Sequence, residues 1–187
     1  MCPLLVKQVI WRNTFDLYLL STRQVFQNLI LFLQKHSNTQ FSQLVDIVAF
    51  DTPGKKYRFS IVYILYSLKF NTRIFIQIQT NETHLIQSIT PMYTAAGWME
   101  REIWDFFGIF FLGHHDLRRI LTDYGFNQNP LRKDFPLTGF MEIYYNDEQK
   151  RIVFEPVELA QEYRVFTLKN SWTKDLGDYD SRNVITE

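Results

Sequence analysis

The chain has 187 residues, which suits one domain that buries about two-thirds of the surface its unfolded form exposes. Its 20 Lys and Arg residues balance its 20 Asp and Glu residues, which argues against nucleic acid or an anionic membrane as the partner. Cys2 is the only cysteine, which excludes internal disulfides and any iron–sulfur or zinc site that needs several thiolates from this chain. No apolar run approaches the roughly 18 residues of a membrane-spanning helix. The N-terminal sequence has neither a secretory nor an organellar targeting pattern, so we expect a mature or locally made protein.

The first part of the chain has the pattern of a strand followed by a helix. Alternating apolar residues predict a strand over 14–20. Ser21 and Gln24 have the spacing of a capping box, and apolar side chains at helical spacing predict a helix that extends to Lys35. Three strand-like stretches follow, over 43–50, 57–68 and 72–79. The turn-rich segments between them are short, which favours antiparallel pairing.

Two helices are predicted after these strands. Thr90 and Pro91 have the pattern of an N-cap and a first helical residue, and Gly97 would end this short helix. A second helix is predicted over 98–107, and it is apolar around nearly all of its circumference. Such a helix needs cover on most sides, so docking against another protein is expected. Its narrow polar stripe consists of Arg101, Glu102 and Asp105.

The composition changes after Pro136, where apolar residues are scattered among charges without the pattern of a second compact domain. We therefore predict an α+β core domain over 1–136, with a single mostly antiparallel sheet packed with helices. An extended C-terminal arm is predicted over 137–187, with a disordered end from about residue 175.

The stretch 100–136 carries eleven charged side chains among eight aromatic ones. Charge beside bulky apolar surface is costly to desolvate unless it is paired or matched by a partner. Helical spacing predicts that Arg101 pairs with Asp105 at i, i+4. We expect Glu100 or Glu102 to pair with an arginine once the chain folds back. The candidate arginines are Arg118, Arg119 and Arg132.

The sequence gives less support for a metal site, a phosphate-binding loop, a catalytic nucleophile or an RNA-binding strand. His114, His115 and Asp116 are adjacent, so their side chains diverge, and the remaining histidines lack metal-ligand spacing. The chain has no glycine-rich phosphate loop, no nucleophile elbow and no complete RNA-binding strand motif. One alternative of another class is a free-standing enzyme that uses Glu102, Asp105 and His114, which would show activity or a bound metal when purified alone.

Three blocks of sequence stand out, WMEREIWDFFGIFFLGHHDLRRILTDYGFN at 98–127, PLRKDFPLTGF at 130–140 and FEPVELAQEYRVF at 154–166. Together they resemble a known family, the 30 kDa subunit of respiratory complex I, the NADH:ubiquinone oxidoreductase. The resemblance implies a core subunit of the hydrophilic arm that binds no cofactor itself, within a complex that uses NADH, FMN, iron–sulfur clusters and ubiquinone. It implies binding to the 49 kDa quinone-site subunit and neighbouring cluster-bearing subunits, with the tail wrapping its neighbour.

The chain departs from the pattern of this family in three loops. His114-His115-Asp116 stands where the family commonly has His-Pro-Asp. Asn127-Gln128-Asn129 stands where Glu-Gly-His often precedes the PLRKD motif, and Asn170-Ser171-Trp172 stands where Ser-Pro-Trp is usual. These departures do not change the charged residues by which the blocks at 98–127 and 130–140 resemble the family.

The composition is also informative about origin, because frequent Phe, Ile, Asn and Tyr with few Ala and Gly are typical of AT-rich organellar coding. We expect a mitochondrially encoded protein, peripheral on the matrix side of the inner membrane. A bacterial or plastid homologue stays open, as does the equivalent subunit of a plastid-type or hydrogenase-type membrane complex with another electron donor.

The resemblance implies a role in assembly and in electron transfer from NADH to ubiquinone coupled to proton pumping, with no catalytic, cofactor-binding or metal-binding residue on this chain. The residues expected to matter fall into two groups. The predicted ion-pair frame consists of Glu100, Arg101, Glu102, Asp105, Arg118, Arg119, Arg132 and Lys133. The predicted partner-docking residues are Trp104, Phe107, Tyr163, Phe166 and Trp172.

Overall fold

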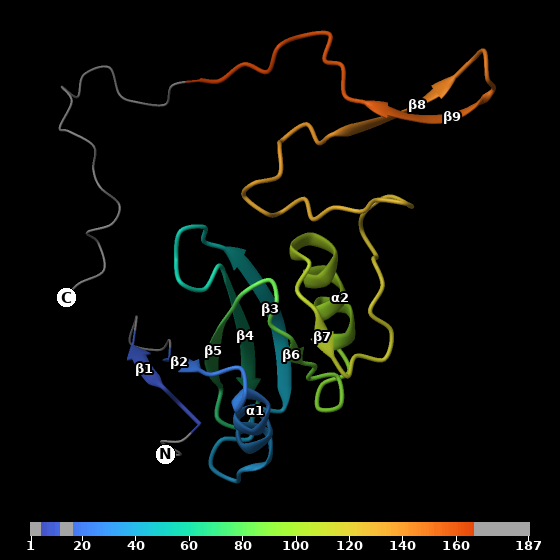
Figure 1. Ribbon diagram of the computed structural model, residues 1–187. Helices are drawn as coiled ribbons and strands as arrows, with labels where there is room; N and C mark the ends of the chain where they lie inside the picture. Colours follow the sequence, from blue (N-terminus) through green and yellow to red (C-terminus); the bar gives the residue numbers. More distant parts are fainter. Residues whose placement is uncertain (1–4, 12–16, 167–187) are drawn as a thin grey trace, which may run out of the picture. The chain divides into compact units, whose positions relative to one another are not determined.

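The computed structural model describes residues 5–11 and 17–166. Contacts within the chain divide it into two units, Met1–Phe140 and Met141–Glu187. A five-stranded sheet with the order β1-β2-β5-β4-β3 forms the centre of the first unit (Figure 1). Its strands are β1 (Gln8–Trp11), β2 (Leu17–Ser21), β3 (Gln43–Asp51), β4 (Phe59–Ser67) and β5 (Thr72–Thr80).

All neighbouring strands of this sheet are antiparallel except β2 and β5, which are parallel. The predicted α+β class and the mostly antiparallel sheet are therefore confirmed. The parallel pair arises because helix α1 (Phe26–Lys35) connects β2 to β3, and the chain then returns through β4 to place β5 beside β2.

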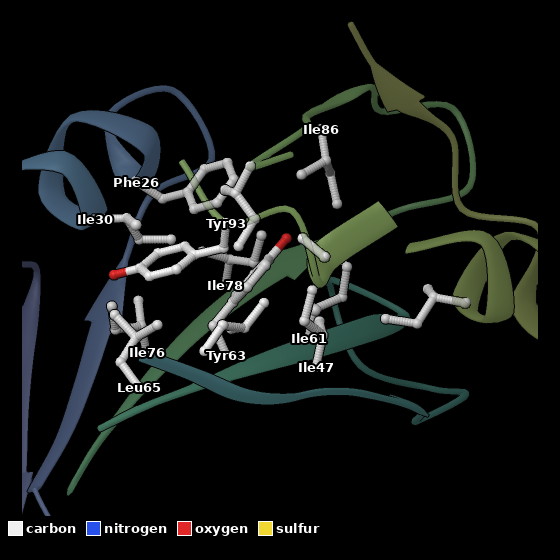
Figure 2. Close-up of a cluster of buried hydrophobic side chains, with 14 of the residues drawn as sticks. Phe26, Ile30, Ile47, Ile61, Tyr63, Leu65, Ile76, Ile78, Ile86 and Tyr93 are labelled. Atoms are coloured by element: carbon white, nitrogen blue, oxygen red, sulfur yellow. The ribbon is translucent and has the colours of Figure 1, made fainter. Parts of the chain in front are cut away.

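The main core lies between the sheet and α1 (Figure 2). Ile76 and Ile78 of β5 are fully buried, as the alternation of that strand predicts. Phe26 and Ile30 of α1 are also fully buried, and the ring of Phe26 lies 5.3 Å from that of Tyr63 on β4. The apolar stripe of the helix is thus covered by the apolar face of the sheet.

The predicted capping box at the start of α1 is wrong. Ser21 belongs to β2, where it pairs with Ile78, and its hydroxyl donates a hydrogen bond to the carbonyl of Leu5 (2.8 Å). Pairing with β5 holds Ser21 in the sheet, so the helix begins later, at Phe26. The N-cap residue Val25 makes no side-chain capping bond.

The predicted short helix that begins at Thr90 is wrong as well. Residues 90–95 form turns, and the Thr90 hydroxyl is hydrogen-bonded to Ser88 Oγ (2.7 Å). The Tyr93 hydroxyl donates to the carbonyl of Phe41 (2.5 Å), which anchors these turns to the core. Helix α2 then runs over Ala96–Phe107, so Gly97 lies inside a helix and does not end one.

Helix α2 packs against β3 and ends at Gly108, whose φ of +72° is in the left-handed region. Two short strands, β6 (Ile86–Gln87) and β7 (Phe111–Leu112), form a parallel pair beside it. Neither helix in the described part of the chain is long and apolar enough to cross a membrane.

The second unit contains an antiparallel hairpin that was not predicted. Its strands are β8 (Met141–Asn146) and β9 (Arg151–Pro156). Asn146 Oδ1 accepts hydrogen bonds from the backbone N–H groups of Glu148 (2.9 Å) and Gln149 (3.1 Å), which closes the turn. The alternation of Met141, Ile143 and Tyr145 was the sequence signal for this strand.

Candidate functional site

Three carboxylates of the first unit have fully buried side chains. Asp51 ends β3, whereas Glu100 and Asp105 lie on α2. An ionised group in such a place requires several hydrogen-bond donors or a shifted pKa. The partners of these three side chains therefore indicate what the region does.

Asp105 takes its partners from a segment downstream in the chain. Its Oδ2 accepts hydrogen bonds from the backbone N–H groups of Leu121 (2.9 Å) and Thr122 (3.0 Å). Its Oδ1 accepts from the Thr122 hydroxyl (2.7 Å) and forms an ion pair with Arg119 Nη1 (3.0 Å). The carboxylate thereby fixes this irregular segment against the helix.

The electrostatics of Asp105 follow from these donors. Burial by itself raises the pKa of the carboxyl. The hydroxyl and N–H of Thr122, the N–H of Leu121 and the guanidinium of Arg119 outweigh burial and lower the pKa below its usual value. Asp105 is therefore ionised at neutral pH.

The predicted ion pair between Arg101 and Asp105 is wrong. Arg101 Nε donates to the carbonyl of Arg118 (3.0 Å), and Arg101 Nη2 donates to that of Arg119 (3.4 Å). Its guanidinium carbon lies 5.2 Å from the ring centre of Trp98. The downstream segment satisfies both residues separately, because its carbonyls accept from Arg101 while its N–H groups donate to Asp105.

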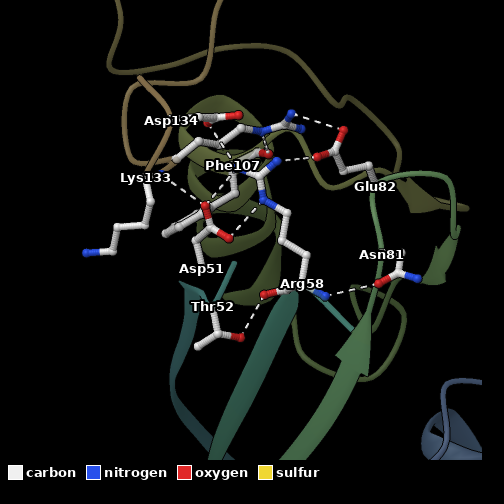
Figure 3. A network of polar contacts seen from close by, with 9 residues as sticks. Asp51, Thr52, Arg58, Asn81, Glu82, Phe107, Lys133 and Asp134 are labelled. Carbon is white, nitrogen blue, oxygen red and sulfur yellow. Dashed lines mark hydrogen bonds and ion pairs between the residues drawn. The ribbon is translucent and has the colours of Figure 1, made fainter. Parts of the chain in front are cut away.

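Arg58 is the centre of a second network, in which residues from four parts of the chain meet (Figure 3). Its Nε and Nη2 donate to the two carboxylate oxygens of Asp51, each at 2.9 Å, which is the bidentate geometry of strong arginine pairs. Nη2 also donates to Asp134 Oδ1 (2.9 Å), and Nη1 donates to Glu82. The backbone N–H of Lys133 donates to Asp51 Oδ2 (2.9 Å).

These contacts set the protonation states of the network. The hydrogen bond from Arg58 lowers the pKa of Asp51, and this effect exceeds the opposing effect of burial. In return, the hydrogen bonds to Asp51 and Asp134 raise the pKa of Arg58. Asp51 and Arg58 are therefore both charged throughout the neutral pH range.

Arg132 extends this network to α2. Its Nη1 lies 3.4 Å from Glu82 Oε2, and its Nε donates to the carbonyl of Phe107 (2.7 Å). The guanidinium carbons of Arg58 and Arg132 lie 5.2 Å and 5.4 Å from the ring centre of Phe59. Both cations thus contact the same buried ring, in the geometry of cation–π pairs.

Glu100 has a different environment. Its Oε2 accepts a hydrogen bond from Ser88 Oγ (2.6 Å), and its Oε1 accepts one from the N–H of Ile89 (2.8 Å). His114 Nε2 is 3.9 Å from Oε2 and is hydrogen-bonded to the carbonyl of Gly97 (3.1 Å). Burial raises the pKa of Glu100 to about 7. The hydrogen bonds from Ser88 and Ile89 favour the ionised form, but they offset only part of the effect of burial.

The predicted pairing of Glu100 or Glu102 with a downstream arginine is also wrong. Glu100 faces the residues that follow β6, so Ser88 and Ile89 are its partners. Glu102 is exposed and forms no ion pair within the described residues. The arginines are engaged elsewhere, Arg118 with Asp116, Arg119 with Asp105 and Arg132 with Glu82.

The C-terminal carbonyls of α2 are satisfied by side chains from the same downstream segment. Asn129 Nδ2 and Arg119 Nη1 donate to the carbonyl of Asp105 (3.0 and 3.2 Å), in addition to the bond from Arg132 to Phe107. A Cβ atom on Gly108 would lie 2.6 Å from Asn129 Oδ1 and 2.7 Å from Arg132 Nη2. The helix end therefore needs glycine both for its backbone conformation and for space.

The remaining predicted site residues have mixed positions. Phe107 is buried and meets the Phe59 ring edge-on at 6.3 Å, so it packs within this chain, which contradicts its predicted role as a partner-docking residue. Trp104 is partly exposed and packs edge-on against Phe110 (5.8 Å). Tyr163 and Phe166 are exposed, and Trp172 lies outside the described residues, as does the predicted disordered end.

Several residues of the networks were missed by the sequence reasoning. Asp51 had one usable signal, since it falls on the buried phase of the alternating strand β3. Asp134 lies inside the quoted PLRKDFP block. The remaining missed partners carry no local signal, because their spacing along the chain follows no helical or strand period; they are Arg58, Glu82, Ser88 and Thr122.

The hairpin of the second unit has one wholly apolar face. In its register Met141 pairs with Pro156, Ile143 with Phe154, and Tyr145 with Ile152. All six side chains are exposed. The opposite face is mostly polar and carries a hydrogen bond from the Tyr144 hydroxyl to Glu155 Oε2 (2.8 Å).

Comparison with known proteins gives close relatives. An NADH dehydrogenase [ubiquinone] iron-sulfur protein 3 of Beta trigyna is 47% identical over 166 residues, which cover 89% of this chain and 84% of that protein. An NADH-ubiquinone oxidoreductase subunit 9 of Acanthamoeba castellanii is 52% identical over 157 residues, which cover 84% of this chain and 80% of that protein.

The first of these names mentions iron–sulfur, but the donor set of this chain does not fit a cluster. Such clusters are held by several cysteine thiolates, usually four, whereas this chain has one cysteine. In the part of the chain that the structure describes, no three His, Cys, Asp or Glu side chains are grouped so that they could hold a metal ion.

A solved structure titled as the trypsin-resistant fragment (1-134) of Nqo5 matches with a TM-score of 0.53 and 28% identity, covering 59% of this chain and 89% of that chain. A family model described as "Respiratory-chain NADH dehydrogenase, 30 Kd subunit" matches residues 19–141. This match includes all three buried carboxylates and every partner of Asp105 and Arg58 named above. By this match and these identities, the chain belongs to the family of 30 kDa subunits of the respiratory-chain NADH dehydrogenase.

Proposed function

We propose that this chain is a non-catalytic core subunit of the hydrophilic arm of respiratory complex I. It is needed for assembly and for electron transfer from NADH to ubiquinone coupled to proton pumping. The observation that carries the proposal is the use of the buried charges, since Asp51 and Asp105 each bind donors from distant segments of the same chain. These two buried carboxylates hold separate segments of the chain together, which is a structural role of the kind that a scaffold subunit needs.

The hairpin supports the idea of a docking role. A two-stranded hairpin is marginally stable alone in water, and this one exposes an entire apolar face. Tyr163 and Phe166 lie downstream of β9 in the same unit and are also exposed. We propose that the 49 kDa quinone-site subunit and neighbouring cluster-bearing subunits supply the cover for these residues and for Trp172.

The cofactors of the reaction then reside on other chains. The complex as a whole uses NADH, FMN, iron–sulfur clusters and ubiquinone, and this chain binds none of them. Its proposed location is the matrix side of the mitochondrial inner membrane, as a peripheral subunit. The names of its relatives support membership of this complex, since the two quoted above are an NADH dehydrogenase [ubiquinone] protein and an NADH-ubiquinone oxidoreductase subunit.

The partner list is tested by tagging the full chain in its native cell, separating membrane complexes on a native gel and identifying the co-migrating chains by mass spectrometry. Flavin-binding, cluster-bearing and quinone-site subunits of an NADH dehydrogenase are expected. Migration as a free monomer would contradict the proposal. Co-migration with a complex that has another electron donor would contradict the assigned reaction while leaving the scaffold role intact.

A pair of hairpin variants tests the docking face. Ile143 and Tyr144 are adjacent on β8 and similarly exposed (44% and 40%), but they lie on opposite faces. We expect Ile143→Lys to reduce incorporation into the complex strongly, because it places a charge in an apolar contact. Tyr144→Lys should incorporate nearly as well as the unchanged chain. Equal incorporation of the two variants would rule out the apolar face as the docking surface.

A further inference from the structure

A cavity of about 260 Å³ lies on the first unit, at the turn that precedes α1. Its lining comes from five separate parts of the chain and is rich in hydrogen-bond donors. No acidic side chain lines it in the ranges that the structure describes. The residues that define this basic cavity are Lys7, Arg23, Gln24, Tyr57, Gln79 and His84.

Lys7 is exposed and Arg23 is half-buried, and both differ from the half-buried arginines of the two networks described above. Arg58, Arg119 and Arg132 each have a carboxylate partner. Lys7 and Arg23 have no side-chain hydrogen bond or ion pair within the described residues. Two unpaired like charges in one concavity repel each other, and a bound anion would offset that repulsion.

Glu82, the acidic residue nearest to His84 in the sequence, does not neutralise the positive charge of the cavity. Glu82 is engaged in the other network, where it binds Arg58 and Arg132. Glu82 is thus already paired with two arginines outside the cavity lining. The lining keeps an uncompensated positive charge.

His84 gives an independent observation. Its Nδ1 atom is buried and has no hydrogen-bond partner within the described residues. Buried polar atoms of side chains nearly always have a partner, and each exception requires an explanation. Because this atom is covered while the cavity is open, a ligand oxygen in the cavity that His84 lines becomes its partner only if the His84 ring turns.

The helix that starts beside the cavity adds to the same field. Helix α1 has ten residues, no side-chain capping bond at Val25 and no acidic residue in its first turn. The N–H groups of Val25 and Phe26 donate to the carbonyl of Thr22, but no acidic side chain of the first turn offsets the positive end of the helix dipole. Residues 22–24, which lead into this helix, form part of the cavity lining.

From these observations we propose that the basic cavity binds a phosphate group, either of a small phosphorylated molecule or of a phospholipid headgroup. A phosphate fits better than a carboxylate because Lys7, Arg23 and His84 offer more donors, from different sides, than a carboxylate accepts. The two cations also match the charge of nearly −2 that a phosphate monoester carries at neutral pH. This site is separate from the networks of Asp51 and Asp105.

The first test uses the full chain and inorganic phosphate as the probe. Binding is measured by calorimetry, and the His84 ring is followed by NMR, with chloride at equal ionic strength as the reference. We expect saturable binding of one phosphate and a shift of the His84 ring signals. Arg23→Gln should weaken binding about tenfold or more, the effect of losing a charge-assisted hydrogen bond.

Arg73→Gln is the matched control. Arg73 lies at the opposite end of β5 from Gln79, outside the cavity, and like Arg23 it has no ion pair within the described residues. This variant should bind phosphate with unchanged affinity. Equal loss in both variants, or no saturable binding by the unchanged chain, would overturn the proposal; thermal unfolding without phosphate verifies that each variant is folded.

Vesicles distinguish the two sources of phosphate. The full chain is mixed with vesicles of phosphatidylcholine alone or with added phosphatidic acid, at physiological ionic strength. Flotation only with phosphatidic acid, and its loss in Arg23→Gln, would identify a lipid headgroup as the ligand. Binding of free phosphate without flotation would identify a soluble phosphate compound, and both outcomes support the site. Flotation that Arg23→Gln and Arg73→Gln reduce equally would reflect only general charge and would contradict a headgroup site.

Discussion

Asp105 and Thr122 lie seventeen positions apart, yet the carboxylate of Asp105 accepts hydrogen bonds from both the hydroxyl and the backbone N–H of Thr122, at 2.7 and 3.0 Å. This double contact orders a segment that has no helix or strand of its own between 113 and 140. The segment in turn supplies Asn129 and Arg132 to the end of α2. The fold around α2 is therefore held by a small number of polar contacts.

Asp105→Asn tests the weight of this contact. The variant keeps the size of the side chain but leaves Arg119 without its charge partner and turns one acceptor into a donor. We expect the free energy of unfolding to fall by about 3 kcal/mol, as in other broken buried ion pairs. Glu102→Gln, on the exposed side of the same helix, should change it by less than about 0.5 kcal/mol. Urea unfolding of both variants provides the comparison, and equal effects would refute the structural role of Asp105.

Arg58→Lys tests the bidentate pair with Asp51. Lysine keeps the charge but cannot donate in parallel to two carboxylate oxygens while also reaching Asp134. A loss of about 2 kcal/mol is expected. Arg118→Lys is the control, because its pair with Asp116 is solvent-exposed (73% and 56% of the side chains) and should contribute less than about 1 kcal/mol. If the two variants unfold at the same urea concentration, the Arg58 network adds nothing to stability.

A comparison of Gly108→Ala with Gly113→Ala separates the cost of backbone strain from the cost of crowding by neighbouring side chains. Gly108 and Gly113 both have positive φ, +72° and +82°, but only Gly108 has neighbours where a Cβ atom would lie. We expect Gly113→Ala to cost about 1 kcal/mol for the left-handed backbone. Gly108→Ala should cost about 3 kcal/mol, since Asn129 and Arg132 must also move. Similar melting temperatures for the two variants would show that the helix end has room for a methyl group.

Glu100 makes stability depend on pH in a defined window. The pKa of Glu100 is about 7 in the folded chain, against an ordinary value of 4.5 that applies to the unfolded chain. As pH rises, the folded state therefore loses this proton at a higher pH than the unfolded state does. Stability should therefore fall as pH rises from about 4.5 to 7, by about 3 kcal/mol in total, and stay level above that window. Asp51 and Asp105 affect stability only at lower pH. Their pKa values are lowered in the folded chain, so the stability that they contribute is lost as pH falls below about 3.8.

Glu100→Gln should remove this pH dependence. A glutamine amide accepts from the N–H of Ile89 and donates to Ser88 Oγ, so it satisfies both partners without a charge. The variant is expected to be as stable as the unchanged chain near pH 5 and more stable at pH 8. Denaturant unfolding at the two pH values measures the difference. A variant with the same slope as the unchanged chain would place the titration on another group.

The sequence predicted the regular parts of the fold well, because their signals are local. The alternation over 72–79 and the helical spacing of the stretch 98–107 describe β5 and α2 closely. The capping box at Ser21 and the N-cap at Thr90 failed because their hydroxyls bind other partners, Leu5 and Ser88. Tertiary contacts override local capping signals in both cases.

The site was predicted less well, for a related reason. The charged residues of the stretch 100–136 were singled out, but helical spacing paired Arg101 with Asp105, whereas the downstream segment supplies the partners of both. Helical period also placed Asp105 on the polar stripe of the helix beside Arg101 and Glu102, although donors from 119–122 bury it. Such donors follow no period in the sequence, so only the folded chain reveals them.

The scaffold role is tested most directly in the native cell, by comparing the amount of assembled NADH dehydrogenase with its turnover per assembled complex. Asp105→Asn and the control Glu102→Gln are introduced into the full chain, the complex is quantified on native gels, and NADH:ubiquinone activity is measured per complex. We predict that Asp105→Asn lowers the amount of complex while each assembled complex works at the normal rate. A normal amount of complex with slow turnover would contradict a structural role for this carboxylate and point to chemistry on this chain.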